Sequence, residues 1–287
     1  MSRAFDAIVI GAGQAGPPLA GRMTAAGMNV ALIERKLFGG TCVNTGCIPT
    51  KTLVASAKAA HMARRAADFG VAIGSAVGVD MKAVKARKDR VSGDARSNVE
   101  KWLNGMQGCT VFAGQARFES ATDVRVGSEL LTAPRIFIDV GGRAAVPDMP
   151  GVGTVRTLTN TTILELDEVP RHLVVVGGSY IGLEFAQMVR RFGAQVTVVE
   201  KAARLIGRED EDVSDAIRAI LEAEGIAVRL GAECIRFDPR GSDIGVGVQC
   251  TAGEPEVVGS HVLLAVGRGP NTDDLGLDAA GVATDER

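Results

Sequence analysis

The sequence predicts an α/β fold with two Rossmann-like dinucleotide-binding domains. Two glycine-rich turns each stand between a run of β-branched residues and a helical segment, and each is followed by an acid at the end of a second apolar run. Glu34 follows Gly11 by 23 residues, and Glu200 follows Gly177 by the same interval. This spacing is typical of a strand–helix–strand unit whose turn holds a pyrophosphate and whose acid binds a ribose.

The first copy occupies residues 6–34. A strand is predicted at 6–10, and a helix then runs from the turn to about Ala26, where Gly27 stops it. A second strand at 30–34 ends on the acid. We expect the pyrophosphate to lie on the helix N-terminus, where unpaired N–H groups attract anions. The residues expected to bind this dinucleotide are Gly11, Gly13, Ala15, Gly16 and Glu34.

The second copy occupies residues 173–200, with a buried parallel strand at 173–176, a helix at 183–192 and a strand at 195–200. Ser179 stands where the fingerprint has its second glycine. A serine adds a Cβ but also a hydroxyl that can bind phosphate, so we expect it to be tolerated. The expected binding residues are Gly177, Ser179, Gly182 and Glu200.

The rest of the chain reads as connections around these two units. The segments expected between the copies are a helix at 81–103, strands of an antiparallel ribbon at 110–114, 116–118, 124–126 and 135–140, and a Gly/Pro-rich linker at 141–151. The segments expected after them are a helix from about Asp212 to Glu224, a meander of short strands, and a last apolar strand at 261–266.

Two cysteines five residues apart, Cys42 and Cys47, follow the first copy. In an ideal helix such residues lie about 7.5 Å apart along the axis and point about 140° away from each other, so a disulfide requires a bent segment. Asn44 and Gly46 are residue types that allow the bend, and Pro49 suits the first turn of a helix running to about Asp68.

This arrangement predicts a reactive thiol pair. Cys47 adjoins the expected helix start, where the macrodipole favours a thiolate, and Cys42 is expected on a looser strand beside Gly39 and Gly40. The competing interpretations are a zinc half-site, which needs two further ligands and tighter spacing, and inert buried thiols. We interpret the other cysteines, Cys109, Cys234 and Cys250, as buried hydrophobic side chains, and we expect no metal site.

Composition limits the function further. The chain has 287 residues, 46% of them hydrophobic, and a net charge of −2. Dispersed basic residues predict neither nucleic-acid nor membrane binding. Five cysteines do not form a secreted disulfide framework, and the N-terminus shows no signal or spanning helix, so we expect a soluble cytoplasmic protein.

Four motifs in one order carry a family resemblance: Gly11 to Gly16, Cys42 to Lys51, Gly177 to Glu184, and Gly267 to Asn271. Together they resemble the flavoprotein (pyridine nucleotide) disulfide oxidoreductases over essentially the whole chain, closest to the mercuric-reductase-like and dihydrolipoamide dehydrogenase branch. The resemblance implies an FAD-binding domain at 1–147, an inserted NAD(P)-binding domain at 148–267, and a return to the FAD domain at 268–287.

The resemblance also implies roles for individual residues. The first turn would bind FAD, and the second a nicotinamide nucleotide. Cys47 matches the thiol nearest the flavin, and Cys42 the thiol that exchanges with substrate. Lys51 matches a lysine near the flavin, Glu184 its glutamate partner, and Tyr180 the lid over the nicotinamide. The remaining expected cofactor-binding residues are Ala116 and Gly267.

NADH is expected rather than NADPH, because Glu200 would repel a 2′-phosphate, although Lys201 and Arg204 leave NADPH possible. Family members continue into a second FAD segment and a dimer-forming interface domain, so this sequence resembles an N-terminal portion of a homodimeric enzyme. We expect electrons to pass from NAD(P)H through FAD to Cys42 and Cys47, and on to a small disulfide or a metal ion. The alternative is a non-catalytic FAD- and NAD-binding fragment that acts as a sensor or scaffold.

Overall fold

The computed structural model describes residues 2–232, 235–248 and 254–285. The chain forms two compact units, which we describe separately. Unit 1 contains residues 1–49, 89–143 and 268–287, and unit 2 contains residues 50–88 and 144–267. The two units differ from the expected domains in residues 50–88, which belong to unit 2. The domain boundaries expected from the sequence therefore stay a prediction: 1–147, 148–267 and 268–287.

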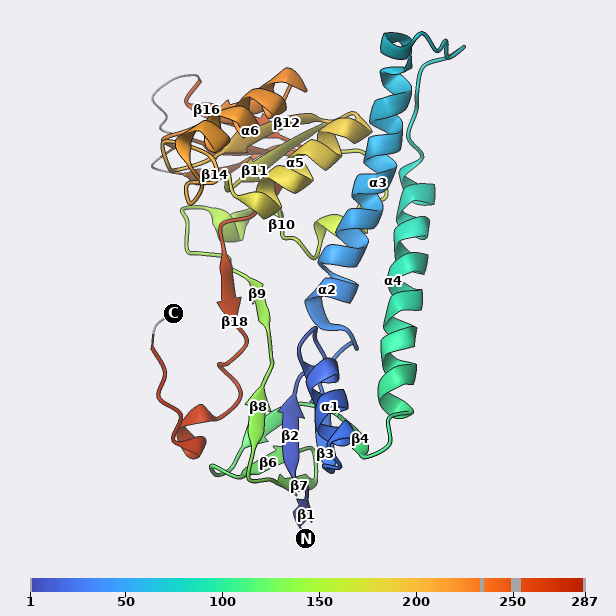
Figure 1. Cartoon of the computed structure of the whole chain (residues 1–287). Helices are drawn as coiled ribbons and strands as arrows, with labels where there is room; N and C mark the ends of the chain where they lie inside the picture. Colours follow the sequence, from blue (N-terminus) through green and yellow to red (C-terminus); the bar gives the residue numbers. More distant parts are fainter. Residues whose placement is uncertain (1, 233–234, 249–253, 286–287) are drawn as a thin grey trace. The chain divides into compact units, whose positions relative to one another are not determined.

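Unit 1 is built on a four-stranded parallel sheet in the order β4-β3-β2-β8. Its central strands are apolar and buried except for Glu34 at the end of β3, as expected for a parallel sheet covered on both faces. Helix α1 (Gly16–Ala25) packs on it, as Figure 1 shows. The strands are β2 (Ala7–Ile10), β3 (Val30–Glu34), β4 (Cys109–Ala113) and β8 (Ile136–Ile138).

A second sheet of unit 1 has the order β1-β7-β6-β5, antiparallel except for the β1–β7 pair. Only two of the four segments expected in an antiparallel ribbon belong to it. The segments at 110–114 and 135–140 are parallel strands of the first sheet, because a short apolar run fits either kind of strand. The strands are β1 (Ser2–Ala4), β5 (Ala116–Phe118), β6 (Asp123–Val126) and β7 (Glu129–Thr132).

The cysteine motif is helical on both sides of a break. Cys42 lies in the short helix α2 (Gly40–Asn44), so the expected strand at this position is wrong, and Cys47 begins α3 (Cys47–Arg64). Pro49 is in the first turn of α3, where its missing N–H costs little. Helix α3 ends four residues before the expected end at Asp68, and a 3-10 turn, η1 (Ala66–Phe69), follows. The long helix α4 (Met81–Asn104) confirms the helix expected at 81–103.

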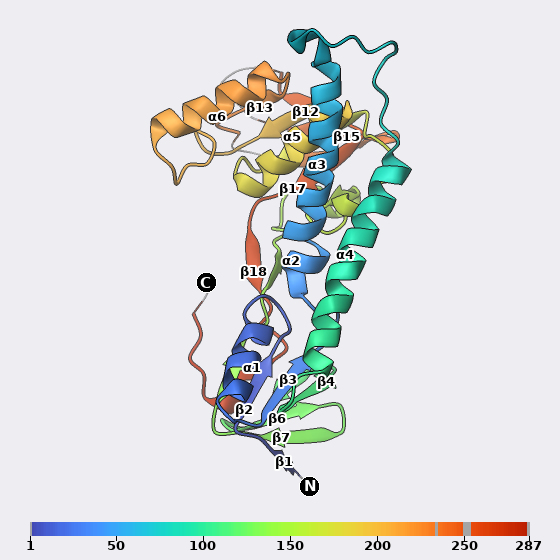
Figure 2. The same ribbon diagram turned by 45° about the vertical axis from the view of Figure 1, so that its right-hand side comes forward.

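Unit 2 has a five-stranded parallel sheet in the order β10-β17-β11-β12-β13. Alternate residues of β11 face opposite sides. Leu173 and Val175 pack with the helices α5 and α6, whereas Val174 and Val176 pack with an antiparallel sheet of β14, β15 and β16. Figures 1 and 2 both show α5 and α6 on one face of the parallel sheet.

The elements of unit 2 have these bounds: β10 (Thr157–Leu158), β11 (His172–Val176), α5 (Tyr180–Phe192), β12 (Gln195–Val199), α6 (Glu211–Ala223), β13 (Ala227–Arg229), β14 (Arg236–Arg240), β15 (Asp243–Gly247), β16 (Glu256–Gly259) and β17 (His261–Leu264). Short 3-10 turns lie at η2 (Val152–Thr154) and η3 (Ile163–Glu165). The second strand–helix–strand copy is therefore confirmed within one or a few residues.

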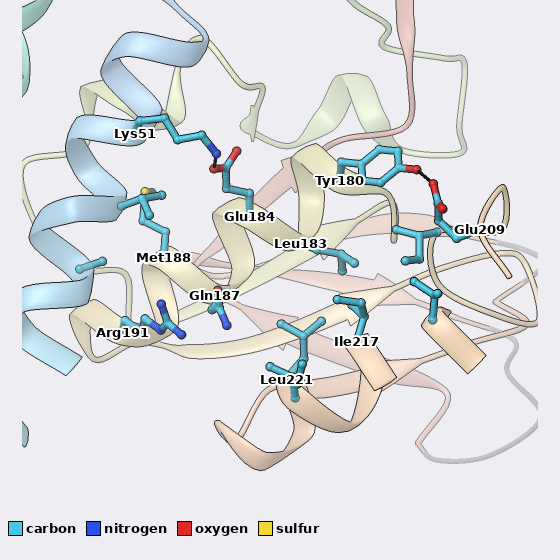
Figure 3. A pocket seen from close by; sticks show the side chains of 15 residues that line it. Lys51, Tyr180, Leu183, Glu184, Gln187, Met188, Arg191, Glu209, Ile217 and Leu221 are labelled. Atoms are coloured by element: carbon cyan, nitrogen blue, oxygen red, sulfur yellow. Dashed lines mark hydrogen bonds and ion pairs between the residues drawn. The ribbon is translucent and has the colours of Figure 1, made fainter. Parts of the chain in front are cut away.

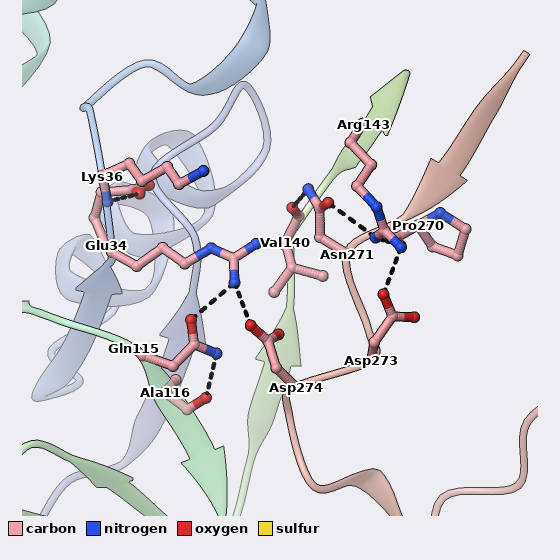
Figure 4. A network of polar contacts seen from close by, with 11 residues as sticks. Glu34, Lys36, Gln115, Ala116, Val140, Arg143, Pro270, Asn271, Asp273 and Asp274 are labelled. Carbon is pink, nitrogen blue, oxygen red and sulfur yellow. Dashed lines mark hydrogen bonds and ion pairs between the residues drawn. The ribbon is translucent and has the colours of Figure 1, made fainter. Parts of the chain in front are cut away.

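The chain returns to unit 1 after β17. Strand β18 (Arg268–Pro270) pairs with β9 (Gly142–Ala144), and η4 (Leu277–Ala280) follows. Leu275 is buried in the core of unit 1. Asp274 forms an ion pair with Arg35, and Asp273 forms one with Arg143 (Figure 4). The predicted fold class is therefore confirmed: two Rossmann-like units, the second inserted into the first, with antiparallel sheets beside them.

Candidate functional site

The first glycine-rich turn depends on its glycines. Gly11 has φ +118°, and a Cβ there would overlap the Asp139 carbonyl oxygen. A Cβ on Gly16 would overlap the carbonyl oxygen of Gly11. The turn is also held by Glu34, whose Oε2 accepts a 2.9 Å hydrogen bond from the N–H of Ala12.

The second turn repeats this construction. Gly177 has φ +115°, and a Cβ there would overlap the Ala265 carbonyl oxygen. A Cβ on Gly182 would overlap the carbonyl oxygen of Gly177. Glu200 Oε2 accepts a 2.6 Å hydrogen bond from the N–H of Gly178. The repeat found in the sequence is thus a repeat of contacts as well as of elements.

Both fingerprint acids are fixed by the main chain on two sides. Glu34 Oε1 accepts from the Lys36 N–H at 2.8 Å, and Glu200 Oε1 accepts from the Ala202 N–H at 2.8 Å. Each carboxylate oxygen keeps a second lone pair for a ribose hydroxyl. The ribose contacts expected of these acids stay a prediction.

The residues of both turns fit a pyrophosphate. Within the described part of the chain, the N–H groups of Gly13 and Gln14 have no hydrogen-bond partner, and neither has the N–H of Ser179. The Ser179 hydroxyl makes no capping hydrogen bond to α5 among these residues. Unpaired N–H groups at a helix N-terminus bind anions, so each turn can hold one phosphate group or more.

The bend between the two cysteines has a local cause. Residues 45–46 separate α2 from α3, and a Cβ on Gly46 would come within 2.9 Å of the Thr41 carbonyl oxygen. Asn44 Nδ2 donates to the carbonyl oxygens of Phe38 and Gly40, each at 2.9 Å. Both residue types that the sequence identified as bend residues therefore shape the bend.

The bend brings the two thiols together. Cys42 and Cys47 are free thiols in this structure, and they lie close enough for Cys47 to raise the pKa of Cys42. Cys42 is partly buried and Cys47 is exposed. Cys109 on β4 is also a partly buried free thiol, whereas Cys234 and Cys250 lie outside the described residues.

Electrostatics distinguishes the pair. The pKa of the Cys42 thiol is raised, first by burial and then by the neighbouring Cys47 thiol. The N–H groups of Cys47 and Ile48, at the start of α3, face the Cys42 sulfur and lower its pKa. The helix start therefore stabilises a Cys42 thiolate, a contact that the sequence did not identify.

A pocket of about 490 Å³ lies in unit 2 beside α5 (Figure 3). At its rim, Lys51 forms an ion pair with Glu184, and the Tyr180 hydroxyl donates to Glu209. Its wall on the α6 side is apolar. The residues of that wall are Val213, Ile217, Ile220 and Leu221.

The structure therefore brings together three of the predicted site residues, Lys51, Glu184 and Tyr180, around one pocket. Their catalytic roles stay predictions. Glu209 was not expected, because nothing in its sequence context separates it from other surface acids.

The other expected cofactor-binding residues lie at strand ends. The Ala116 carbonyl oxygen accepts a 2.9 Å hydrogen bond from Gln115 Nε2, and the Gly267 carbonyl oxygen accepts one of 3.0 Å from the Ala145 N–H. Their cofactor contacts stay predictions. Among the described residues, no three His, Cys, Asp or Glu side chains could hold a metal ion together. Across the same residues, every helix is too short or too polar to span a membrane.

Two nucleotide-type turns and a pair of adjacent thiols define the class of nucleotide-dependent disulfide oxidoreductases. The family model described as pyridine nucleotide-disulphide oxidoreductase matches residues 5–287, and the chain belongs to this family.

Three curated relatives show the range of the family. RclA of Escherichia coli K12, a probable pyridine nucleotide-disulfide oxidoreductase, is 37% identical over 290 residues, which are 99% of this chain and 61% of RclA. Mercuric reductase of Lysinibacillus sphaericus is 33% identical over 280 residues, 98% of this chain and 51% of that protein. Dihydrolipoyl dehydrogenase of Chlamydia muridarum is 35% identical over 292 residues, 100% of this chain and 62% of that protein.

A solved structure agrees with these relatives. The Cu(II) complex of E. coli RclA, described as an HOCl-induced flavoprotein disulfide reductase, superposes with a TM-score of 0.86 at 34% identity and covers 99% of this chain and 61% of its own. The chain thus spans about half to three-fifths of the length of these relatives.

Proposed function

We propose that this chain carries the FAD- and nicotinamide-binding parts of a flavoprotein disulfide reductase. An electron pair passes from NADH to the Cys42–Cys47 pair and then to a small disulfide or a thiophilic metal ion. The observation that carries the proposal is the approach of the two free thiols to each other across the α2–α3 break.

The two turns divide the cofactors between them. The first turn holds FAD, with its pyrophosphate at the free N–H groups of Gly13 and Gln14 and its ribose at Glu34. The second turn holds NADH in the same way, with Glu200 disfavouring a 2′-phosphate. When bound, FAD accepts a hydride from reduced nicotinamide and delivers the electron pair to a disulfide.

The pocket beside α5 receives the nicotinamide. Its apolar wall excludes water from the planar ring, and the Lys51–Glu184 pair places both signs of charge at its rim. Tyr180 is the lid, and its hydrogen bond to Glu209 holds the lid in one orientation. Lys51 follows Cys47 by one turn of α3, so it supplies a positive charge near the thiol pair.

The thiol pair carries the electrons onward. Two electrons and two protons convert the Cys42–Cys47 disulfide into two thiols. A Cys42 thiolate then attacks a substrate disulfide, forming one S–S bond as the substrate bond breaks and releasing one substrate thiol. Cys47 attacks Sγ of Cys42, releases the second substrate thiol and restores the bridge.

A metal-ion substrate would bind to both thiolates. Thiolates prefer soft metal ions, and one RclA structure is a Cu(II) complex. The roles of the two cysteines follow from the family resemblance. Exposure alone does not favour Cys42 as the exchanging thiol, since Cys47 is the more exposed; the proposal requires bound FAD to cover Cys47.

Reconstitution with FAD tests the proposal. We expect the purified chain to retain flavin absorbance after desalting and to lose it when NADH is added under anaerobic conditions. No protein-bound flavin after incubation with excess FAD would refute the FAD site. Bound flavin that NADH does not bleach would favour the non-catalytic binding module instead.

A further inference from the structure

Asp139 places a carboxylate at the anion-binding end of α1. It directly follows β8, and its N–H donates to the Ile10 carbonyl oxygen at 2.8 Å. Its Oδ2 accepts from the N–H of Gly16 at 2.7 Å, and the N–H of Ala15 also faces the carboxylate. These N–H groups belong to the turn that we assign to the FAD pyrophosphate. The side chain therefore occupies part of a phosphate site.

The second turn provides an internal comparison. Ala265 holds the same place there, because its N–H donates to the Val176 carbonyl oxygen at 2.8 Å. Its carbonyl oxygen also lies against Gly177, as the carbonyl oxygen of Asp139 lies against Gly11. A methyl group accepts no hydrogen bond. The two turns match in these contacts, but among the described residues only the first turn has an acid at this position.

Within the described part of the chain, no positive side chain neutralises the Asp139 carboxylate. Glu34, at the end of β3, is the other charged group that faces it, and it has the same sign. Among the described residues, no lysine or arginine forms an ion pair with Asp139. Burial, and then the charge of Glu34, raise the pKa of Asp139, while the N–H groups of Gly16 and Ala15 oppose the rise.

We propose that Asp139 makes binding at the first turn depend on protonation: the dinucleotide pyrophosphate binds when the Asp139 carboxyl is neutral, so that FAD binding takes up one proton. A pyrophosphate brings negative charge against Asp139, which like-charge repulsion disfavours at short range. The neutral carboxyl can instead donate a hydrogen bond to a phosphate oxygen. The second turn, with Ala265, has no such dependence. This inference rests on the proposed function, because it assumes that the first turn holds FAD.

Titration of the 287-residue chain with FAD, followed by quenching of flavin fluorescence between about pH 5.5 and pH 8.5, tests the proposal. Above the pKa of Asp139, the dissociation constant of the unchanged chain should rise by up to about tenfold per pH unit. Asp139→Asn should abolish this dependence and bind FAD about tenfold or more tightly at the upper pH. Asp139→Ala removes the charge without an amide and should do the same if the asparagine variant folds poorly.

The matched control is Ala265→Asp in the second turn. This variant should weaken NADH binding and make it pH-dependent, while leaving FAD binding unchanged. NADH binding by the Asp139 variants shows that their second unit is intact.

The outcomes separate the two proposals. FAD affinity and pH dependence that are the same in the unchanged chain and in both Asp139 variants would overturn the role of Asp139 and leave the FAD site standing. Failure of every variant to bind FAD at any pH would refute the proposed function itself.

Discussion

Glu34 and Glu200 each have a structural contact that the sequence motif did not reveal. Each carboxylate accepts the N–H of the residue after the first glycine of its turn, so it stabilises the turn before any nucleotide binds. Loss of such an acid would therefore change the turn as well as the proposed ribose contact. A variant that keeps the hydrogen bond and removes the charge separates the two effects.

Glu200→Gln is that variant. Its amide oxygen can still accept from the Gly178 N–H, but the charge that repels a 2′-phosphate is gone. We expect the preference for NADH over NADPH to fall about tenfold, which corresponds to about 1.4 kcal/mol. Dissociation constants for both nucleotides measure this change. Glu34→Gln is the control and should leave the ratio as it is; an unchanged ratio in Glu200→Gln would contradict the assignment.

Cys42 offers a second test at the residue scale. Burial and the Cys47 thiol raise its pKa, while two N–H groups of α3 oppose them. Cys47→Ala removes the thiol neighbour and keeps the N–H groups, so the pKa of Cys42 should fall and its alkylation at about pH 7 should accelerate severalfold. Iodoacetamide labelling across pH, read by mass spectrometry, measures both.

Cys109 is the reference in that experiment, because burial alone raises its pKa and Cys47 is not among the causes. Its labelling rate should be the same in the unchanged chain and in Cys47→Ala. A Cys42 labelling profile that does not move would show that the two thiols do not influence each other.

At the scale of elements, both strand–helix–strand copies depend on the same close contact between a glycine and a carbonyl group. Gly16 packs on the Gly11 carbonyl and Gly182 on the Gly177 carbonyl, where a Cβ has no room. Overpacking of this kind costs about 1–3 kcal/mol or more. Each substitution should damage its own nucleotide site.

We expect Gly16→Ala to lose FAD binding and keep NADH binding, and Gly182→Ala to do the reverse. Gly93 is the matched control, because it lies inside α4 with open space around it. Gly93→Ala should leave both sites intact and raise the free energy of unfolding by about 0.5–1 kcal/mol. Thermal unfolding and nucleotide titrations measure all three; loss of both sites in either turn variant would contradict independent units.

The elements were predicted well where the spacing of apolar residues agreed with a residue type that ends a strand or helix. Residues 30–34 and 81–103 combine a clear apolar pattern with a stop, and both are correct within one residue. The strands at 110–114 and 135–140 were assigned to the wrong sheet, because pairing depends on distant residues. Cys42 was expected in a strand, because a five-residue helix such as α2 has too few positions to show a helical period.

The candidate site was predicted less completely than the fold. Glycine spacing and the two cysteines identify the turns and the bend from local sequence. Asp139 and Glu209 act through contacts with residues far away in the chain, and Glu209 has no sequence signal. Asp139 had one: it is an acid in the apolar run at 135–140, and Ala265 stands in the corresponding place of the second copy.

At the scale of the whole molecule, one chain places two glycine-rich turns of the nucleotide-binding type and one thiol pair in a single nested fold. The chain matches its family from residue 5 to residue 287, and it spans 61% of RclA and 51% of a mercuric reductase. The catalytic activity and the substrate therefore stay part of the proposed function. Electron transfer from NADH to the thiol pair is the step that we propose for these features.

Thiol counting tests that step most directly. The FAD-loaded chain, first oxidised, is given about one equivalent of NADH without oxygen, then denatured and titrated for free thiols, with the gained thiols mapped by mass spectrometry. A disulfide reduced by one hydride gives two thiols. We predict a gain of two thiols, at Cys42 and Cys47, and none in a Cys42→Ser control. No gain of thiols, or a gain at other cysteines, would contradict the account.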